Sequence, residues 1–173
     1  GIGMSGALDC RDLYDRQELS ASRLDLLGAP AAGTALEDGY QYLEMRDGVR
    51  LSTDLYFPEC AGRSLPVILT RTPYDKRTFR DPASEVWKFV AAGFVVAVQD
   101  LRGTYESEGE CRVSVHERVD GYDTVEWLAA QPWSNGRVGT YGCSHRGEVQ
   151  YQLAALRPPA LACAVVQAGA SVL

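Results

Sequence analysis

The chain has 173 residues, with 17 Lys or Arg against 23 Asp or Glu, so its formal net charge is −6. This acidic balance excludes the basic surface that nucleic acid or anionic lipid requires. The hydrophobic fraction of 46% excludes a chain that is disordered throughout, and the longest apolar run, 89–98, has about half of the roughly 20 residues that cross a bilayer.

The cysteines indicate a reducing compartment. There are five of them, an odd number, and none forms a C-x-x-C pair, a pattern that favours free thiols over a disulfide framework. The N-terminus lacks the basic start and apolar run of a secretion signal. We therefore expect a cytoplasmic protein.

The first 39 residues differ from the rest of the chain. They carry several charges and an Ala-Pro-Ala-Ala-Gly stretch at 29–33. Leucines on one imperfect side of residues 16–27 predict a short helix. We expect 1–39 to be an N-terminal appendage, in part helical, and the folded region to be 40–173.

An antiparallel hairpin opens the folded region. Residues 40–45 and 49–57 alternate apolar and polar side chains. Between them lies Asp47-Gly48, a dipeptide typical of tight hairpin turns. The pattern therefore predicts two adjacent antiparallel strands.

Strands and helices alternate after the hairpin. Strands are expected at 67–70, 94–98, 138–142 and 161–166, and helices at 83–92, 117–130 and 147–156. The continuous apolar run 67–70 is typical of a central strand buried on both faces. The helix at 117–130 is predicted to be amphipathic, with an apolar side made of Val119, Tyr122, Val125 and Leu128. This order indicates an α/β fold with a mostly parallel sheet and helices on both faces.

Residues 139–147 carry the strongest chemical signal. They lie between an expected strand and an expected helix, where a sharp turn with small flanking residues strains its central residue and forms a nucleophile elbow. Ser144 would then be an exposed nucleophile, and the N–H of His145 at the helix N-terminus would donate to an oxyanion. A glycine-rich turn with a solvent-facing serine is the alternative, and the motif alone does not decide.

Several further motifs resemble one family when taken in chain order. They are Arg46 to Leu51, Leu65 to Leu69, Arg71 to Lys76, Gly93 to Val96, Gln99 to Gly103, Ser107 to Glu110, Asp123 to Leu128, Gln131 to Gly136 and the Ser144 elbow. Together they resemble the X-Pro dipeptidyl-peptidase and cocaine esterase family, also called CocE/NonD hydrolases. The resemblance runs from about Tyr40 to about Val166.

The resemblance implies an α/β-hydrolase domain whose Ser–Asp–His triad acts on esters, amides or peptides through an acyl-enzyme. By position, Ser144 matches the family nucleophile and Tyr74 matches the tyrosine whose hydroxyl donates to the oxyanion. His145 matches the residue whose backbone N–H is the second donor. The family usually has tyrosine at that position, but the oxyanion hole needs only its N–H.

The resemblance leaves the general base unassigned. In the family the catalytic Asp and His lie on later strands, so we expect 40–173 to be the first half of the hydrolase sheet, truncated before those strands. The side chain of His145 leaves the backbone away from Ser144, and His116 is expected to be a solvated residue before a helix, so neither is expected to be the base. The missing Asp and His would come from a C-terminal half or a partner chain.

Three interpretations of function stay open. The first is a serine hydrolase acting through Ser144 on a small ester, an amide or an X-Pro peptide. The second is a non-catalytic α/β-hydrolase-like binding or assembly subunit, and the third is a complete small binding domain. Because the strand at 161–166 would be an unpaired apolar edge, we expect a second polypeptide or a homo-oligomer to complete the sheet.

No metal or cofactor is expected. Cys143 and His145 alone are too few ligands for zinc, and no glycine-rich nucleotide motif occurs. Glu106, Glu108 and Glu110 lack the spacing of a calcium loop and are expected to form a solvated loop.

Overall fold

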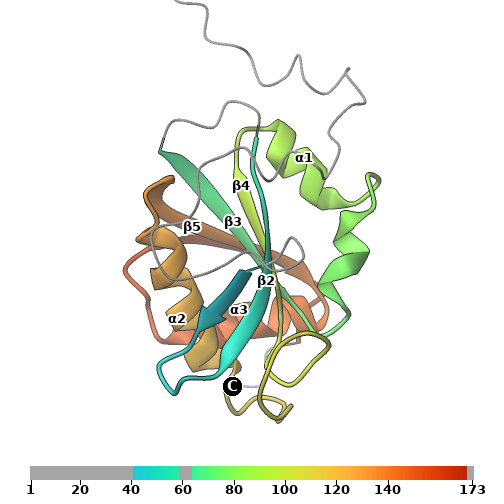
Figure 1. The fold of residues 1–173 in the computed structure, drawn as a ribbon, viewed down its shortest axis with the longest axis vertical. Helices are drawn as coiled ribbons and strands as arrows, with labels where there is room; N and C mark the ends of the chain where they lie inside the picture. Colours follow the sequence, from blue (N-terminus) through green and yellow to red (C-terminus); the bar gives the residue numbers. More distant parts are fainter. Residues whose placement is uncertain (1–40, 59–63, 171–173) are drawn as a thin grey trace, which may run out of the picture.

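The computed structural model describes residues 41–58 and 64–170, which form a six-stranded sheet with helices on both sides (Figure 1). The appendage predicted at 1–39 lies outside these residues. The elements are β1 Gln41–Glu44, β2 Arg50–Tyr56, β3 Leu65–Thr72, the short 3-10 helix η2 Lys76–Arg80, α1 Glu85–Ala91, β4 Val95–Asp100, α2 Glu117–Ala129, β5 Ser134–Cys143, α3 His145–Ala155 and β6 Leu161–Gln167. None of the helices described here has the length and apolar character needed to cross a membrane.

The strand order is β1-β2-β4-β3-β5-β6. β2 runs antiparallel to β1 and β4, whereas β4, β3, β5 and β6 are parallel to one another. In the β1–β2 turn, Gly48 adopts φ +83°, a left-handed conformation that glycine tolerates without steric cost. The predicted hairpin, the central position of β3 and the mostly parallel sheet are confirmed.

Each face of the sheet has its own apolar core because side chains alternate along a strand. On one face, β-strand side chains pack against α2 and α3; this core includes Val67, Leu69, Val95, Ala97, Val125, Leu128 and Leu153. On the other face, they pack against α1 and η2; this core includes Tyr56, Phe79, Val86, Val90, Val96 and Val98. β4 and β3, at the centre of the sheet, are thus covered on both sides, and the carboxyl ends of the parallel strands meet at one edge of the fold.

The buried side of α2 differs from the one predicted. Val125 and Leu128 are buried as expected, but Val119 and Tyr122 are only partly buried, while Glu117 and Asp120 are buried. Polar contacts hold these two side chains inward. The Asp120 carboxylate accepts from Arg102 at 2.6 Å, and the Glu117 carboxylate accepts from the Ser114 N–H at 2.8 Å. Arg71 donates to the backbone carbonyl of Glu117 at 2.6 Å.

β6 is an edge of the described sheet. It pairs with β5 along one side, and its residues 162–165 are all exposed, with Val165 at 49%. An apolar strand with one unpaired side is a template for further strand addition. Within the described residues, β6 therefore has the exposed edge predicted at 161–166.

Candidate active site

Ser144 occupies a sharp turn between β5 and α3. Its φ of 58° and ψ of −130° lie in a region that non-glycine residues rarely adopt, and its side chain is exposed. The Ser144 N–H donates to the Gln167 carbonyl at 2.9 Å, which ties the turn to the end of β6. A strained, exposed serine at a strand-to-helix turn is the geometry of a nucleophile elbow.

Two glycines allow this turn to close. A Cβ on Gly142 would lie 2.5 Å from the Arg146 Cβ, and a Cβ on Gly147 would lie 3.0 Å from the Val166 Cγ1. Arg146 itself faces away from the turn, because it donates to Glu85 at 2.9 Å and stacks on the Phe79 ring. The G-x-S-x-x-G spacing therefore reflects close packing of α3 against β5 and β6.

The three residues selected from the sequence lie together at the carboxyl ends of β3 and β5. The Tyr74 hydroxyl lies 3.4 Å from Ser144 Oγ. His145 is the first residue of α3, so its N–H has no acceptor within the helix. Ser144 is thus flanked by a phenolic hydroxyl and by a backbone N–H that has no acceptor within the helix.

Neither imidazole of the described residues is hydrogen-bonded to Ser144. His145 Nδ1 lies 2.9 Å from Glu148 Oε2, and its Nε2 lies 4.0 Å from Glu117 Oε1. His116 precedes α2 as its N-cap residue and is partly exposed. Among the described residues, Ser144 Oγ therefore lies within reach of the Tyr74 hydroxyl but contacts no imidazole.

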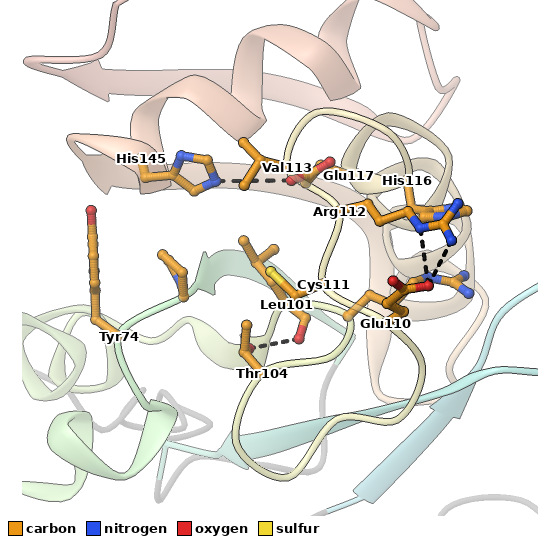
Figure 2. A pocket seen from close by; sticks show the side chains of 12 residues that line it. Tyr74, Leu101, Thr104, Glu110, Cys111, Arg112, Val113, His116, Glu117 and His145 are labelled. Atoms are coloured by element: carbon orange, nitrogen blue, oxygen red, sulfur yellow. Dashed lines mark hydrogen bonds and ion pairs between the residues drawn. The ribbon is translucent and has the colours of Figure 1, made fainter.

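A pocket of about 280 Å³ opens beside Tyr74 and His145 (Figure 2). Much of its wall comes from the loop between β4 and α2, and the wall consists of Pro73, Tyr74, Leu101, Arg102, Thr104, Glu110, Cys111, Arg112, Val113, His116, Glu117 and His145. The pocket thus lies next to the turn that carries Ser144.

In the part of the chain that the structure describes, no three His, Cys, Asp or Glu side chains lie close enough together to hold a metal ion. Cys143 lies next to Ser144 and is a free thiol, as are Cys111 and Cys163.

Comparison with known proteins decides the family. Residues 47–173 match the profile of the X-Pro dipeptidyl-peptidase (S15) family. The chain belongs to the S15 family.

Individual relatives agree with this S15 assignment. Cocaine esterase from Rhodococcus sp. (strain MB1 Bresler) is 42% identical over 113 residues, which cover 64% of this chain and 20% of the esterase. An α-amino acid ester hydrolase has a TM-score of 0.67 at 30% identity, over 84% of this chain and 28% of that chain. A CocE/NonD family hydrolase from Staphylococcus aureus has a TM-score of 0.64 at 25% identity, over 80% of this chain and 32% of that chain.

These comparisons confirm the resemblance and the α/β-hydrolase fold that the sequence predicted. The match spans about a fifth of the length of cocaine esterase. The family assignment therefore covers the region that carries Ser144, Tyr74 and His145.

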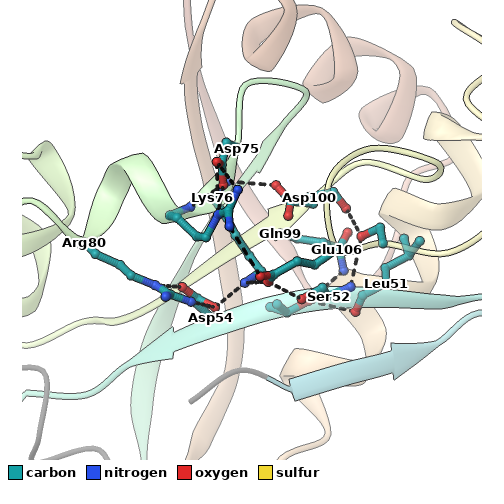
Figure 3. Close-up of polar contacts among 12 residues, drawn as sticks. Leu51, Ser52, Asp54, Asp75, Lys76, Arg80, Gln99, Asp100 and Glu106 are labelled. Carbon is teal, nitrogen blue, oxygen red and sulfur yellow. Dashed lines mark hydrogen bonds and ion pairs between the residues drawn. The ribbon is translucent and has the colours of Figure 1, made fainter. Parts of the chain in front are cut away.

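The S15 chain also contains a buried charge cluster that sequence reasoning missed (Figure 3). The Lys76 ammonium, which is fully buried, donates to Asp54 at 2.7 Å and to Glu106 at 2.5 Å. Glu106 was expected in a solvated loop, but its side chain is only 26% exposed because it pairs with this ammonium. Glu108 and Glu110 instead pair with Arg50 and Arg112 at the surface.

Asp100 lies beside this cluster and titrates abnormally. Burial raises the pKa of its carboxyl to about 6, although the Lys76 N–H and the Lys76 charge oppose the rise. This pKa exceeds the pKa of Asp100 in the unfolded chain, so between about pH 4 and pH 6 the folded state keeps a proton that the unfolded state releases. The stabilisation from Asp100 is therefore full below about pH 4 and is lost as the pH rises through about 6.

Asp100→Asn is therefore expected to raise the free energy of unfolding at pH 8 by about 3 kcal/mol and to change it little at pH 4. Asparagine keeps an acceptor for the Lys76 N–H, which now donates to Asp100 Oδ1 at 2.8 Å. Urea denaturation of the protein at both pH values measures the effect, with the exposed Asp81→Asn as the matched control. An equal change in the free energy of unfolding at pH 4 and pH 8 would contradict the raised pKa of Asp100.

Proposed function

We propose that the protein is a serine hydrolase that transfers an acyl group to water with Ser144 as its nucleophile. The observation that carries this proposal is the strained, exposed Ser144 at the N-terminus of α3, with the Tyr74 hydroxyl 3.4 Å from its Oγ. Membership of the S15 family supports the same reaction class.

The reaction divides into two acyl transfers. Ser144 Oγ attacks the substrate carbonyl carbon and gives its proton to a general base. The carbonyl oxygen then carries the negative charge, which the Tyr74 hydroxyl and the His145 N–H stabilise. Collapse expels the alcohol or amine, which takes the proton from the base. In the second transfer, a water molecule attacks the acyl-enzyme carbonyl and gives a proton to the base. Collapse then breaks the bond to Ser144 Oγ, releases the acid and returns the proton to Ser144.

The base is proposed to come from polypeptide outside the described residues. His145 Nδ1 is hydrogen-bonded to Glu148, and its Nε2 lies 4.0 Å from a Glu117 carboxylate oxygen, so both ring nitrogens face carboxylates and not Ser144. The matched relatives are several times longer than this chain. We assign the Asp and His of the triad to a further segment or a partner chain, which would pair with the exposed edge of β6 and complete the sheet.

The proposed substrates are small esters, amides or short X-Pro peptides. The S15 family name specifies X-Pro peptides, whereas the relatives include an esterase that is named for cocaine and an α-amino acid ester hydrolase. The pocket beside Tyr74 and His145 has room for one substituent of modest size.

Labelling with a fluorophosphonate tests the proposal. The protein, purified at its native length, is expected to gain one adduct on the peptide that contains Ser144, because a phosphonate reports an activated serine. Ser144→Ala should lose the adduct, and the exposed Ser64→Ala should keep it. Intact-mass spectrometry of the same sample reveals whether a second polypeptide accompanies the chain.

An unlabelled Ser144 in the native-length protein would contradict the hydrolase proposal and would favour a non-catalytic binding or assembly role. A second polypeptide in the spectrum would favour completion of the sheet in trans. A homo-oligomer of the chain would indicate that copies close the β6 edge.

A further inference from the structure

Tyr74 depends on its backbone for its position. Tyr74 is 48% exposed, so packing holds only part of the residue. Its hydroxyl nevertheless lies 3.4 Å from Ser144 Oγ, across the gap between two strand ends. An oxyanion donor must be held within a fraction of an ångström to be effective. The source of this precision must therefore lie in the turn that carries Tyr74.

The turn is fixed at both ends by hydrogen bonds. The Tyr74 N–H donates to Thr72 Oγ1 at 2.9 Å, and the Lys76 N–H donates to Asp100 Oδ1 at 2.8 Å. Between them Asp75 adopts φ +74°, a left-handed conformation that is costly without support. The Asp75 carboxylate supplies part of that support by accepting from the Arg77 N–H at 2.9 Å.

Lys76 anchors the turn that carries Tyr74 through its buried side chain. Its whole side chain is buried, and its ammonium lies between Asp54 of β2 and Glu106 of the loop after β4, as Figure 3 shows. The loop is held in turn by β2, because the Ser52 hydroxyl donates to Glu106 at 3.4 Å and the Ser52 N–H donates to Ser107 Oγ at 2.9 Å. The ammonium thus links the Tyr74 turn to two separate elements of the fold.

We propose that Lys76, clamped between Asp54 and Glu106, is a positioning residue that holds the Tyr74 hydroxyl at the oxyanion site. This inference rests on the proposed function, since it assigns a role to residues that support the same site. Lys76 does not touch the reacting atoms. It acts through the backbone of a turn only two residues away from Tyr74.

The two carboxylates that bind Lys76 differ in their other partners. Asp54 also accepts from Arg80 Nε at 2.9 Å, so it stays paired with an arginine if Lys76 moves. Glu106 is the partner that joins Lys76 to the loop between β4 and α2. Lys76→Met would leave both carboxylates without their shared ammonium and is expected to lose the fold. Glu106→Gln loosens one side of the clamp and keeps a hydrogen-bond acceptor, so it is the variant that tests positioning.

A double-mutant cycle between Glu106→Gln and Tyr74→Phe separates positioning from general stability. Glu106→Gln is expected to lower kcat for an activated ester by about tenfold with KM unchanged. In the Tyr74→Phe background the same change should lower kcat less than twofold, because the hydroxyl that it positions is already absent. The matched control is Glu108→Gln, in the same loop but paired with Arg50, which should leave kcat unchanged in both backgrounds.

Two results would overturn the inference while the hydrolase proposal stands. One is an unchanged kcat in Glu106→Gln. The other is a tenfold loss that persists in the Tyr74→Phe background, since that would show action independent of the phenol. Absence of any Ser144-dependent turnover in the unmodified protein would overturn the proposed function itself, and the positioning role would fall with it.

Discussion

Replacing Ser144 by alanine is expected to lower kcat for ester hydrolysis by about a millionfold, the scale observed when a serine nucleophile is removed. Alanine keeps the backbone N–H that donates to Gln167 and supplies no oxygen to attack the carbonyl. The turn is equally strained with either residue, because both carry a Cβ at φ 58°. The loss should therefore be chemical, and thermal stability should stay nearly constant. Steady-state kinetics and a melting curve measure the two quantities.

Cys143→Ala is the matched control for this experiment. Cys143 is the neighbouring nucleophile-type side chain, at the end of β5, and it is a free, partly buried thiol. Its removal should leave kcat within a few-fold of the unmodified protein. If Ser144→Ala retained most of the activity and Cys143→Ala did not, the assignment of the nucleophile would be wrong.

The fold and the elbow could be predicted because their signals are local. A continuous apolar run such as 67–70 indicates a buried strand, and Asp47-Gly48 indicates a turn, without reference to distant residues. The same is true of Gly142, Ser144 and Gly147, whose spacing follows from the packing of one strand on the next helix.

The Lys76 clamp could not be predicted because its partners are distant in the chain. Asp54 precedes Lys76 by 22 residues and Glu106 follows it by 30. Lysine and glutamate are usually exposed, so composition places them at the surface. Their burial becomes favourable only when tertiary structure brings the opposite charges together.

The buried side of α2 shows the same limit. Helical periodicity selects apolar positions, but Arg102, in the loop after β4, pairs with the Asp120 carboxylate, and Arg71 of β3 donates to the backbone carbonyl of Glu117. Burial lowers the pKa of Arg71 to about 10, while the charges of Asp120 and Glu117 partly offset this effect. Charge pairing across elements thus overrides the hydrophobic pattern of a single helix.

Tyr74→Phe is expected to lower kcat by about 100-fold to 1,000-fold and to leave KM nearly unchanged. The ring remains and loses only the hydroxyl that lies 3.4 Å from Ser144 Oγ. A donor that serves the oxyanion interacts more strongly with the transition state than with the neutral carbonyl, so its loss lowers kcat and not affinity. Kinetics on one activated ester, with the exposed Tyr151→Phe on α3 as control, measure this difference.

The division between kcat and KM decides what Tyr74 does. A rise in KM at constant kcat would mean that the phenol binds the ground-state substrate as part of the pocket wall. An unchanged rate would leave the His145 N–H as the donor supplied by this chain. A fall confined to kcat would place the phenol at the oxyanion, because a hydroxyl in this position gains strength only as the carbonyl oxygen becomes negatively charged.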